Sequence, residues 1–438
     1  MKSHNKARCR VSRIDHPRRR APSPESRWLV VVQFAVAAMS PSPLRLGNKI
    51  GGEDTAATKR PNRTTTRWFF VLAAILTGFA GVSAREYPPE VPLPSPFTLP
   101  APTVRVLPNG LKVIVIERHS LPVLTLRLVV KAGSEADPAQ LSGTAQFVAG
   151  LLDEGTARRS ALEIAQAIDQ VGGTIQTGAE WDDSFAEISV LADHAELAFD
   201  LLADMILHPA FAPAEVERAR KQALSTLQIM REDPAYLADA VFSRIELAGT
   251  AYGHPADGTA DSVRRLSAQD LRDFHARYYA PARAILAVVG DIPAEDAFRG
   301  AERFFGDWQA TGGCSPASPD PISNPPALAA SRQVVIIDKP DAVQTEIRIG
   351  NLGIRRDSPD YDALTIANQI LGGPATNRLF KALRSQHGLT YGASSDLTCY
   401  EAAGTWEAKT STRTPETMKS VQLMLEQMKR LRDHPITD

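Results

Sequence analysis

The chain has 438 residues, of which 43% are hydrophobic and 23% charged, and its formal net charge is −1. This length suffices for two or three domains, and the composition is that of a globular protein. The neutral balance gives no sign of nucleic-acid binding. The three cysteines (Cys9, Cys314 and Cys399) show neither a disulfide framework nor a metal-ligand spacing.

The N-terminal region differs in composition from the rest. Residues 1–67 carry 15 Lys and Arg against 4 Asp and Glu, which predicts a disordered extension or a translation start assigned too early. Residues 68–84, WFFVLAAILTGFAGVSA, follow a basic residue and end in small residues, as in a secretory signal. The run is short for a membrane span. We therefore expect export to the periplasm, with an inner-membrane anchor at 68–84 as the alternative.

A Pro-rich stretch at 85–102 predicts an extended tether. After it, alternating apolar and polar residues predict two strands, at 111–117 and 123–130, introduced by the turn Pro108–Gly110. Further elements are expected in chain order: helices at 142–152 and 160–171, a strand pair within 173–191, helices at 195–207 and 213–231, and a strand at 284–289.

The chain repeats itself at a constant offset. VIVIERHSLPVLTLRL from Val113 aligns with VVIIDKPDAVQTEIRI from Val334. The aligned pairs include Ile116 with Ile337, Glu117 with Asp338, Arg127 with Arg348 and Pro138 with Pro359. This predicts two homologous domains, 103–308 and 329–438, joined by the Pro- and Ser-rich linker 309–328. Asp438 corresponds to about residue 212 of the first copy, so the second domain is expected to be incomplete.

Four segments carry a resemblance to a known family: GTAQFVAGLLDEGT from Gly143, YGHPADGT from Tyr252, FHARYYAPARAILAVVGD from Phe274 and LGGPATNRLFKALRSQHGLTYG from Leu371. They resemble the insulinase and mitochondrial-processing-peptidase family of inverted-zincin metallopeptidases. The resemblance implies an α+β fold of two homologous domains that close like a clamshell around a peptide. Each domain would be an antiparallel-rich sheet backed by helices.

The family's zinc motif, H-x-x-E-H, is not kept. Two histidines at i and i+4 share one helical face and grip zinc, while the glutamate activates the bound water. The resemblance places Gln146 and Gly150 at the histidine positions, Ala149 at the general base and Thr226 at the second glutamate ligand. Glycine and alanine offer no ligand or base, so we predict no zinc, no other cofactor and no catalytic residue here.

Other polar residues are candidates to replace the zinc ligands or the general base. Asp153 follows Gly150 by three residues and could share its helical face, although a helix-end or surface carboxylate is the simpler interpretation. Surface or packing roles are expected for His119, His194, His208 and Glu217. Cys314 in the linker and Cys399 in a predicted strand do not make persuasive nucleophiles.

The second domain keeps another part of the family's machinery. LRSQHGLTY contains Arg384 and Tyr391, and the resemblance implies that such a pair reaches the substrate and its scissile carbonyl. Asn377 and Arg378 lie in a Gly-Gly-Pro turn that would line the peptide chamber. The alternative is structural: Arg384 as a helix-end charge, Tyr391 packed on the sheet and the turn serving packing alone.

The family includes heterodimers in which one chain lacks the zinc motif. By that resemblance, we predict a non-catalytic subunit that binds peptide or unfolded protein and partners a zinc-bearing homologous peptidase. One alternative is a stand-alone peptide-binding or scaffold protein of the envelope. The other is an active metalloendopeptidase with an atypical site.

Overall fold

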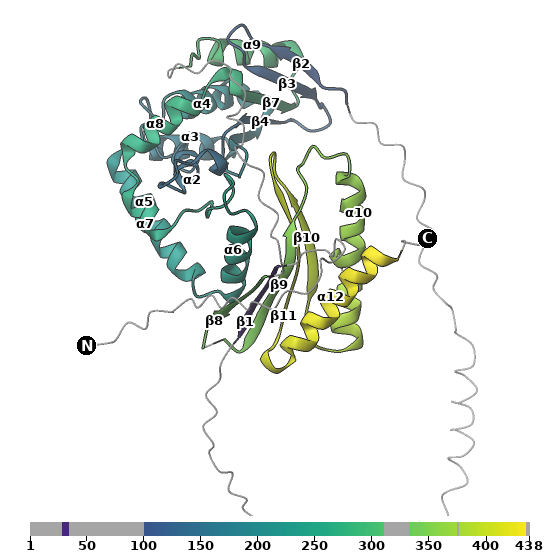
Figure 1. Ribbon diagram of the computed structural model, residues 1–438. Coiled ribbons are helices and arrows are strands. Elements are labelled where there is room, and N and C mark those ends of the chain that lie inside the picture. Colours follow the sequence, from purple (N-terminus) through teal and green to yellow (C-terminus); the bar gives the residue numbers. More distant parts are fainter. Residues whose placement is uncertain (1–28, 35–99, 311–332, 341, 375, 435–438) are drawn as a thin grey trace, which may run out of the picture. The chain divides into compact units, whose positions relative to one another are not determined.

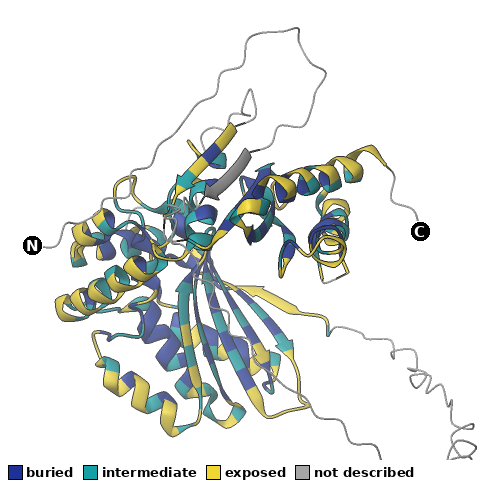
Figure 2. Ribbon diagram, turned by 90° about the horizontal axis from the view of Figure 1, so that it is seen from below, coloured by how far each residue is buried: buried dark blue, intermediate teal, exposed yellow. Residues whose placement is uncertain are grey.

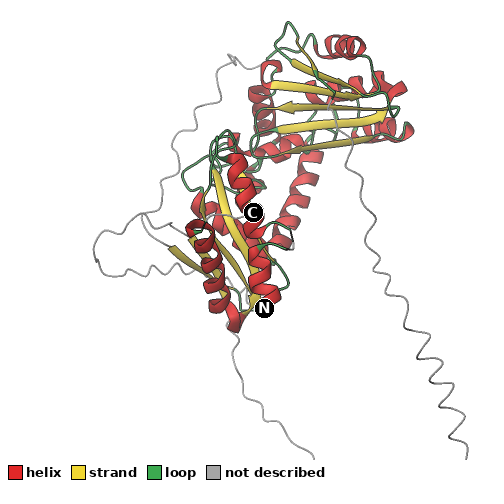
Figure 3. Cartoon of the chain, turned by 90° about the vertical axis from the view of Figure 1, so that its right-hand side faces the viewer, coloured by secondary structure: helices red, strands yellow, loops and turns green. Residues whose placement is uncertain are grey.

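The computed structural model describes residues 29–34, 100–310, 333–340, 342–374 and 376–434 (Figure 1). The predicted signal or anchor at 68–84, most of the basic extension and the tether, nearly all of the linker, and Cys314 lie outside these ranges. The described residues form an α+β protein in which helices accompany two β-sheets (Figure 3). The fold class predicted from the sequence is confirmed.

The first sheet has six strands in the order β2-β3-β7-β4-β6-β5. Their bounds are β2 (Thr103–Val106), β3 (Lys112–Glu117), β4 (Val123–Val130), β5 (Thr174–Ala179), β6 (Ser184–Leu191) and β7 (Ala284–Gly290). Only β3 and β7 are parallel, and all other neighbours are antiparallel. The predicted strands are present, and β4 has the bounds expected from its alternation.

One face of this sheet is buried and the other is polar. Along β4, Leu124, Leu126 and Leu128 are fully buried, whereas Thr125 and Arg127 between them are half-buried (Figure 2). The leucine face packs in the main core with the helices, as the period of two along a strand requires. An antiparallel sheet with one wet face is the usual result of such alternation.

Eight helices precede or follow these strands in the described part of residues 100–310. They are α2 (Thr144–Ala149), α3 (Ala161–Gln170), α4 (Ala195–Leu207), α5 (Pro213–Met230), α6 (Pro234–Glu246), α7 (Ala260–Arg265), α8 (Ala268–Tyr278) and α9 (Ala294–Phe305). The prediction for α4 is confirmed, whereas α3 is one residue shorter than predicted at each end and α5 is one residue shorter at its C-terminal end. The prediction for α2 was wrong at its C-terminal end, because the helix stops at Ala149.

The second sheet has the order β10-β11-β9-β1-β8. Its strands are β1 (Leu29–Phe34), β8 (Gln333–Asp338), β9 (Gln344–Leu352), β10 (Ala393–Cys399) and β11 (Gly404–Arg413). Its helices are α10 (Tyr361–Gly372), α11 (Arg378–Phe380), the π-helical turn Lys381–Gln386, and α12 (Thr417–Asp433). The strand pair β8 and β9 follows β3 and β4 at the offset seen in the sequence.

Both faces of the second sheet are covered at β9. Ile347 and Ile349 are fully buried in a core shared with Met424 of α12. Arg348, between them, points to the other face, where it donates a hydrogen bond to Asp239 of α6. Within the described ranges, no helix combines the length and the apolar character needed to cross a bilayer.

Candidate functional site

Helix α2 is the element on which the family resemblance places the zinc-motif positions, and its N-terminus is held by hydrogen bonds. The Asp137 carboxylate accepts hydrogen bonds from the backbone N–H of Gly143 at 2.6 Å and of Ala145 at 2.8 Å. Burial raises the pKa of Asp137 to about 7, although these backbone donors oppose the shift. Gly143 has φ of 95° and lies against Gly258, where a Cβ would come within 3.2 Å. The local chain path therefore needs glycine at this helix start.

The three motif positions on α2 have different surroundings. The Gln146 side chain is half-buried, and its Nε2 donates to the backbone oxygen of Ala179 on β5 at 2.6 Å. Ala149 is fully buried in the core. Gly150 is exposed, and its N–H closes the last helical hydrogen bond on the Gln146 oxygen at 2.9 Å. The helix therefore ties itself to strand β5 through the residue that replaces the first histidine.

Asp153 does not share a helical face with Gly150. Because α2 ends at Ala149, Asp153 lies in the turn that follows the helix. Its Oδ1 accepts a long hydrogen bond, 3.5 Å, from the Thr177 hydroxyl of β5. Burial raises the pKa of Asp153. The alternative in which Asp153 shares a helical face with Gly150 is therefore wrong, and the carboxylate lies just beyond the helix end as a partner of the neighbouring strand.

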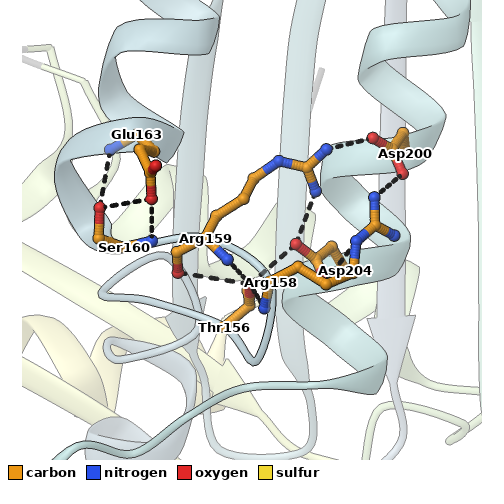
Figure 4. Close-up of polar contacts among 7 residues, drawn as sticks. All are labelled: Thr156, Arg158, Arg159, Ser160, Glu163, Asp200 and Asp204. Atoms are coloured by element: carbon orange, nitrogen blue, oxygen red, sulfur yellow. Dashed lines mark hydrogen bonds and ion pairs between the residues drawn. The ribbon is translucent and has the colours of Figure 1, made fainter.

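The loop after α2 is anchored to α4 by a polar network (Figure 4). The Thr156 hydroxyl donates to Asp204 at 2.8 Å, and Arg159 Nη1 donates to the same carboxylate at 2.7 Å. Arg158 donates to Asp200 one turn earlier at 2.8 Å. Asp204 is 1% exposed, so its charge is stabilised by these buried donors. This network holds the C-terminal end of α2 at a fixed distance from the helical layer.

The position of the second glutamate ligand lies on α5. Thr226 is exposed there and supplies only a hydroxyl. Nearer the start of α5, Arg218 pairs with Glu154, in the loop after α2, at 2.5 Å. Glu217 is exposed and pairs with Arg220 at 2.9 Å, so it is a solvated helix charge. The pairing brings α5 to the α2 loop without adding a carboxylate ligand.

These residues do not fit a zinc ion. Gln146 offers a metal only the neutral Oε1 of its amide, and Ala149 and Gly150 have no metal-binding side-chain atom. Zinc in catalytic sites takes three protein ligands from His, Glu, Asp or Cys. Among the residues that the structure describes, no three or more His, Cys, Asp or Glu side chains are grouped to hold a metal.

The histidines weighed from the sequence lie away from α2. His119 is exposed, and its Nδ1 lies 2.7 Å from Asp291 and its Nε2 3.3 Å from Glu117. The hydrogen bond to Asp291, then that to Glu117, raises the pKa of His119. His194 lies beside Asp193 at 3.6 Å, and His208 is exposed. Of the two carboxylate partners of His119, Glu117 is a near neighbour in the chain, whereas Asp291 lies 172 residues away and was not found from the sequence.

Two further groups are poor bases or nucleophiles. His275, which the sequence analysis passed over, contacts the Ile206 backbone oxygen at 2.8 Å, and burial lowers its pKa to about 4. It is a neutral core residue at physiological pH. Cys399 is partly buried, and burial raises the pKa of its thiol, which disfavours the reactive thiolate.

Arg384 and Tyr391 come together in the second sheet's helical layer. Arg384 Nη1 donates to the backbone oxygen of Tyr391 at 2.7 Å, and the guanidinium lies 4.9 Å from the Phe380 ring centre. The Tyr391 side chain is 82% exposed. The alternative in which Tyr391 packs on the sheet is therefore wrong. Both functional groups face solvent, where a peptide or a second chain could reach them.

The neighbouring turn has a different character. Asn377 is 6% exposed, donates to the Gly373 oxygen at 2.6 Å and accepts from the Phe380 N–H at 2.7 Å. Its amide is used in capping α11 and closing the turn. Arg378 has a buried Nη1 with no hydrogen-bond partner among the described residues. Of the two, only Arg378 has a donor left for a ligand.

A junction that the sequence analysis missed lies beside α2 and β5. Asp182, in the turn between β5 and β6, accepts from the Tyr252 hydroxyl at 2.6 Å and from the Glu401 N–H at 2.9 Å. The Tyr252 and Tyr400 rings stack at 4.7 Å, and Trp181 packs edge-on against Tyr252. The turn between β10 and β11 is thus bonded to the end of the strand that Gln146 contacts. Only the YGHP motif hinted at this role, through Tyr252.

Comparisons with known proteins agree along the chain. The profile of the insulinase family (peptidase family M16) matches residues 112–254, and that of the peptidase M16 inactive domain matches residues 265–438. A Mycobacterium leprae protein described as an uncharacterized zinc protease is 30% identical over 304 residues, 68% of this chain and 66% of that protein.

Two further similarities are with a processing peptidase and a solved structure. A probable mitochondrial-processing peptidase subunit beta from Arabidopsis thaliana is 25% identical over 285 residues, 63% of this chain and 51% of that subunit. The crystal structure of a peptidase M16 inactive domain from Pseudomonas fluorescens superposes with a TM-score of 0.67 at 29% identity, covering 77% of this chain and 80% of that one. This chain therefore spans just under two thirds of the mycobacterial relative and about half of the plant subunit.

Proposed function

This chain belongs to the peptidase M16 (insulinase) family, and from that premise we propose that it is a non-catalytic member. In the proposal it binds extended peptide and works as the partner of a zinc-bearing homologous peptidase. The plant relative is by its name one subunit of a processing peptidase, which makes a division of labour between two related chains a reasonable expectation.

The observation that carries the proposal is the chemistry at the motif positions. Gln146, Ala149, Gly150 and Thr226 together supply one engaged amide and one exposed hydroxyl. Losing a general base alone costs about 10²–10⁴ in rate. Losing the metal ligands as well removes the Lewis acid and the activated water, so peptide hydrolysis must come from another chain.

Strand β5 offers a surface for peptide binding. It is the last strand in the order of the first sheet, so one of its backbone edges has no strand partner within the described ranges. Thr174 and Gln176 on it are exposed, and its end at Ala179 is fixed by Gln146. An extended peptide can add to such an edge through main-chain hydrogen bonds. The peptide would then run beside α2, where the zinc would lie in an active relative.

Arg384, Tyr391 and Arg378 supply polar groups suited to peptide. The first two are held together by the 2.7 Å hydrogen bond and face solvent, and Arg378 keeps one buried N–H without a partner. Arginine donors suit carboxylates, and a tyrosine hydroxyl can donate to a carbonyl oxygen. In a heterodimer these groups could complete the active centre of the zinc-bearing partner.

Reconstitution tests the proposal. This chain, a family member with an intact H-x-x-E-H motif, and their mixture are assayed with a fluorogenic extended peptide. We expect no cleavage by this chain and a gain in the mixture over the zinc-bearing chain alone. Tyr391→Phe and Arg384→Ala should each lower the mixture's rate by about 10²-fold, as loss of one oxyanion donor does.

The exposed Arg413, on the second sheet, gives a matched control, because Arg413→Ala should leave the mixture unchanged. Cleavage by this chain alone would overturn the non-catalytic assignment. Peptide binding without any gain in the mixture would overturn the partnership and support a stand-alone peptide-binding protein of the envelope. Export through residues 68–84 stays a prediction, since they lie outside the described ranges.

A further inference from the structure

Each sheet has one strand inserted between two strands that follow each other in the sequence. This inserted strand comes from later in the chain in the first sheet and from earlier in the chain in the second. In the first sheet, β7 lies between β3 and β4, parallel to β3 and antiparallel to β4. In the second sheet, β1 lies between β8 and β9, parallel to β8 and antiparallel to β9. The strand β7 comes after the other strands of its sheet, whereas β1 comes more than 290 residues before β8.

The register shows that the two strands occupy equivalent positions. Ala287 of β7 lies opposite Ile114 of β3, and Val31 of β1 lies opposite Val335 of β8. Since Ile114 and Val335 are related by the repeat offset, Val31 stands where Ala287 stands. This equivalence comes from the parallel neighbour alone.

The antiparallel neighbours, β4 in the first sheet and β9 in the second, independently show the same equivalence of Val31 with Ala287. Ala287 lies opposite Arg127 of β4, and Val31 lies opposite Arg348 of β9. Arg127 and Arg348 are a pair of the sequence repeat at the same offset. A slip of one residue on either side would break the agreement and turn the strand's other face to the core. The six residues of β1 therefore match residues 285–290 of β7 one for one.

The sequence of β1 suits an inner strand. LVVVQF has five apolar residues of six, with three consecutive valines, in a region otherwise rich in basic and small polar residues. Continuous β-branched runs are typical of strands covered on both faces. Here both neighbouring strands carry buried residues, Val335 on β8 and Ile347 on β9, and α6 packs against β1 as well as β9.

We propose that Leu29–Phe34 is a built-in donor strand that completes the second sheet, in the place that β7 fills in the first. The inner edges of β8 and β9 need hydrogen-bond partners, because unpaired backbone groups beside a buried core are costly. The N-terminal segment is thus part of the folding unit and must stay in the folded protein. Cleavage after Ala84 would remove β1, and export that leaves residues 1–67 on the other side of a membrane would separate β1 from β8 and β9. Neither event can occur in a molecule that uses this strand.

Disulfide trapping tests the register. In a full chain with Cys9, Cys314 and Cys399 changed to Ser, the pair Val32→Cys and Ile347→Cys places two thiols directly opposite each other on antiparallel strands. Such Cα pairs lie about 4.5–5.5 Å apart, within the range of a disulfide. We expect mild oxidation to give a cross-link within one chain, found as a linked peptide pair by mass spectrometry.

The control pair is Val31→Cys with Ile347→Cys, whose positions are out of register and face opposite sides of the sheet. It should not cross-link. A disulfide between two chains would show that a second copy donates the strand, and would overturn the proposal. Absence of any cross-link in the folded Val32–Ile347 variant would overturn it too, as would a purified protein whose mass excludes residues 29–34.

Hydrogen exchange gives a second measurement. Val32→Pro removes a ladder donor in an inner strand, while Val32→Ile keeps the strand's character. We expect amides of both β8 and β9 to exchange about tenfold faster or more in the proline variant, with β3 and β4 unchanged. Unchanged protection of β8 and β9 would show that something other than β1 covers these edges.

Discussion

Two equivalent arginines show how differently the two sheets are used. Arg127 of β4 is 39% exposed, pairs with Glu187 at 2.9 Å and lies over the Phe185 ring. Arg348 of β9 is 4% exposed and pairs with Glu346 at 3.0 Å and with Asp239 of α6. The repeat keeps the residue but not its environment. The first sheet keeps a polar face next to the proposed peptide edge, whereas the second sheet is covered by α6 at β9.

The largest expected effect comes from breaking the buried arginine. Arg348→Ala leaves the mostly buried Glu346 and the partly exposed Asp239 without their cation, so the free energy of unfolding should fall by about 2–3 kcal/mol. Arg127→Ala removes a partly exposed pair and should cost about 0.5–1 kcal/mol. Urea unfolding of both variants measures the difference. Equal losses would contradict the view that only the second sheet is closed on both faces.

Helix starts in the two halves give the next contrast. Asn377 is buried and uses both ends of its amide, so Asn377→Ala should lower the free energy of unfolding by about 2 kcal/mol. Ser160 forms an exposed capping box with Glu163, and Ser160→Ala should cost about 1 kcal/mol. The variants are compared by thermal unfolding. If Ser160→Ala lowers the free energy of unfolding more than Asn377→Ala does, Asn377 contributes little to the stability of the Gly-Gly-Pro turn. That result would favour a ligand-binding role for Asn377.

The closed second sheet should also contribute a pH dependence, through a buried carboxylate on its own strand β11. Burial, and then the nearby charge of Asp239, raise the pKa of Glu407 to about 7, and its Oε2 has no hydrogen-bond partner. The folded state therefore binds a proton that the unfolded state releases at lower pH, and stability falls as the pH rises from about 4.5 to 7. Glu407→Gln should raise stability by about 1–2 kcal/mol at pH 8 and by little at pH 5.

The matched control for this titration is Glu401→Gln, because Glu401 is exposed in the turn between β10 and β11. It should have no such pH-dependent effect. Stabilisation by Glu407→Gln that is the same at pH 5 and pH 8 would mean that the gain comes from packing and not from a buried carboxylate. Denaturant midpoints across this pH range decide the matter.

Local patterns predicted the fold well. The alternation along β4 and the amphipathic α4 were found with their bounds, because the spacing of apolar residues is encoded in neighbouring positions. The offset repeat correctly anticipated β8 and β9. The early end of α2 was missed although Gly150, directly after Ala149, is a local signal for the end of a helix.

The site was harder to predict than the fold. The alignment with the family motif identified positions Gln146, Ala149 and Gly150. The hydrogen bond from Gln146 to Ala179 could not be predicted, because it depends on how strand β5 packs beside α2 in the folded protein. The Asp182 junction and the strand β1 depend on partners that are 70 or more residues away. The spacing of residues along the chain does not reveal such contacts, because they form only when the chain topology brings distant segments together.

The measurement that tests the central claim most directly is zinc content by elemental analysis of the purified chain after dialysis, prepared without any partner. A restored variant, with Gln146→His, Ala149→Glu, Gly150→His and Thr226→Glu together, provides the comparison. The account predicts essentially no zinc in the natural chain and a gain of zinc in the restored one. About one zinc per natural chain, surviving dialysis, would contradict it and would show that other ligands build a metal centre in this protein.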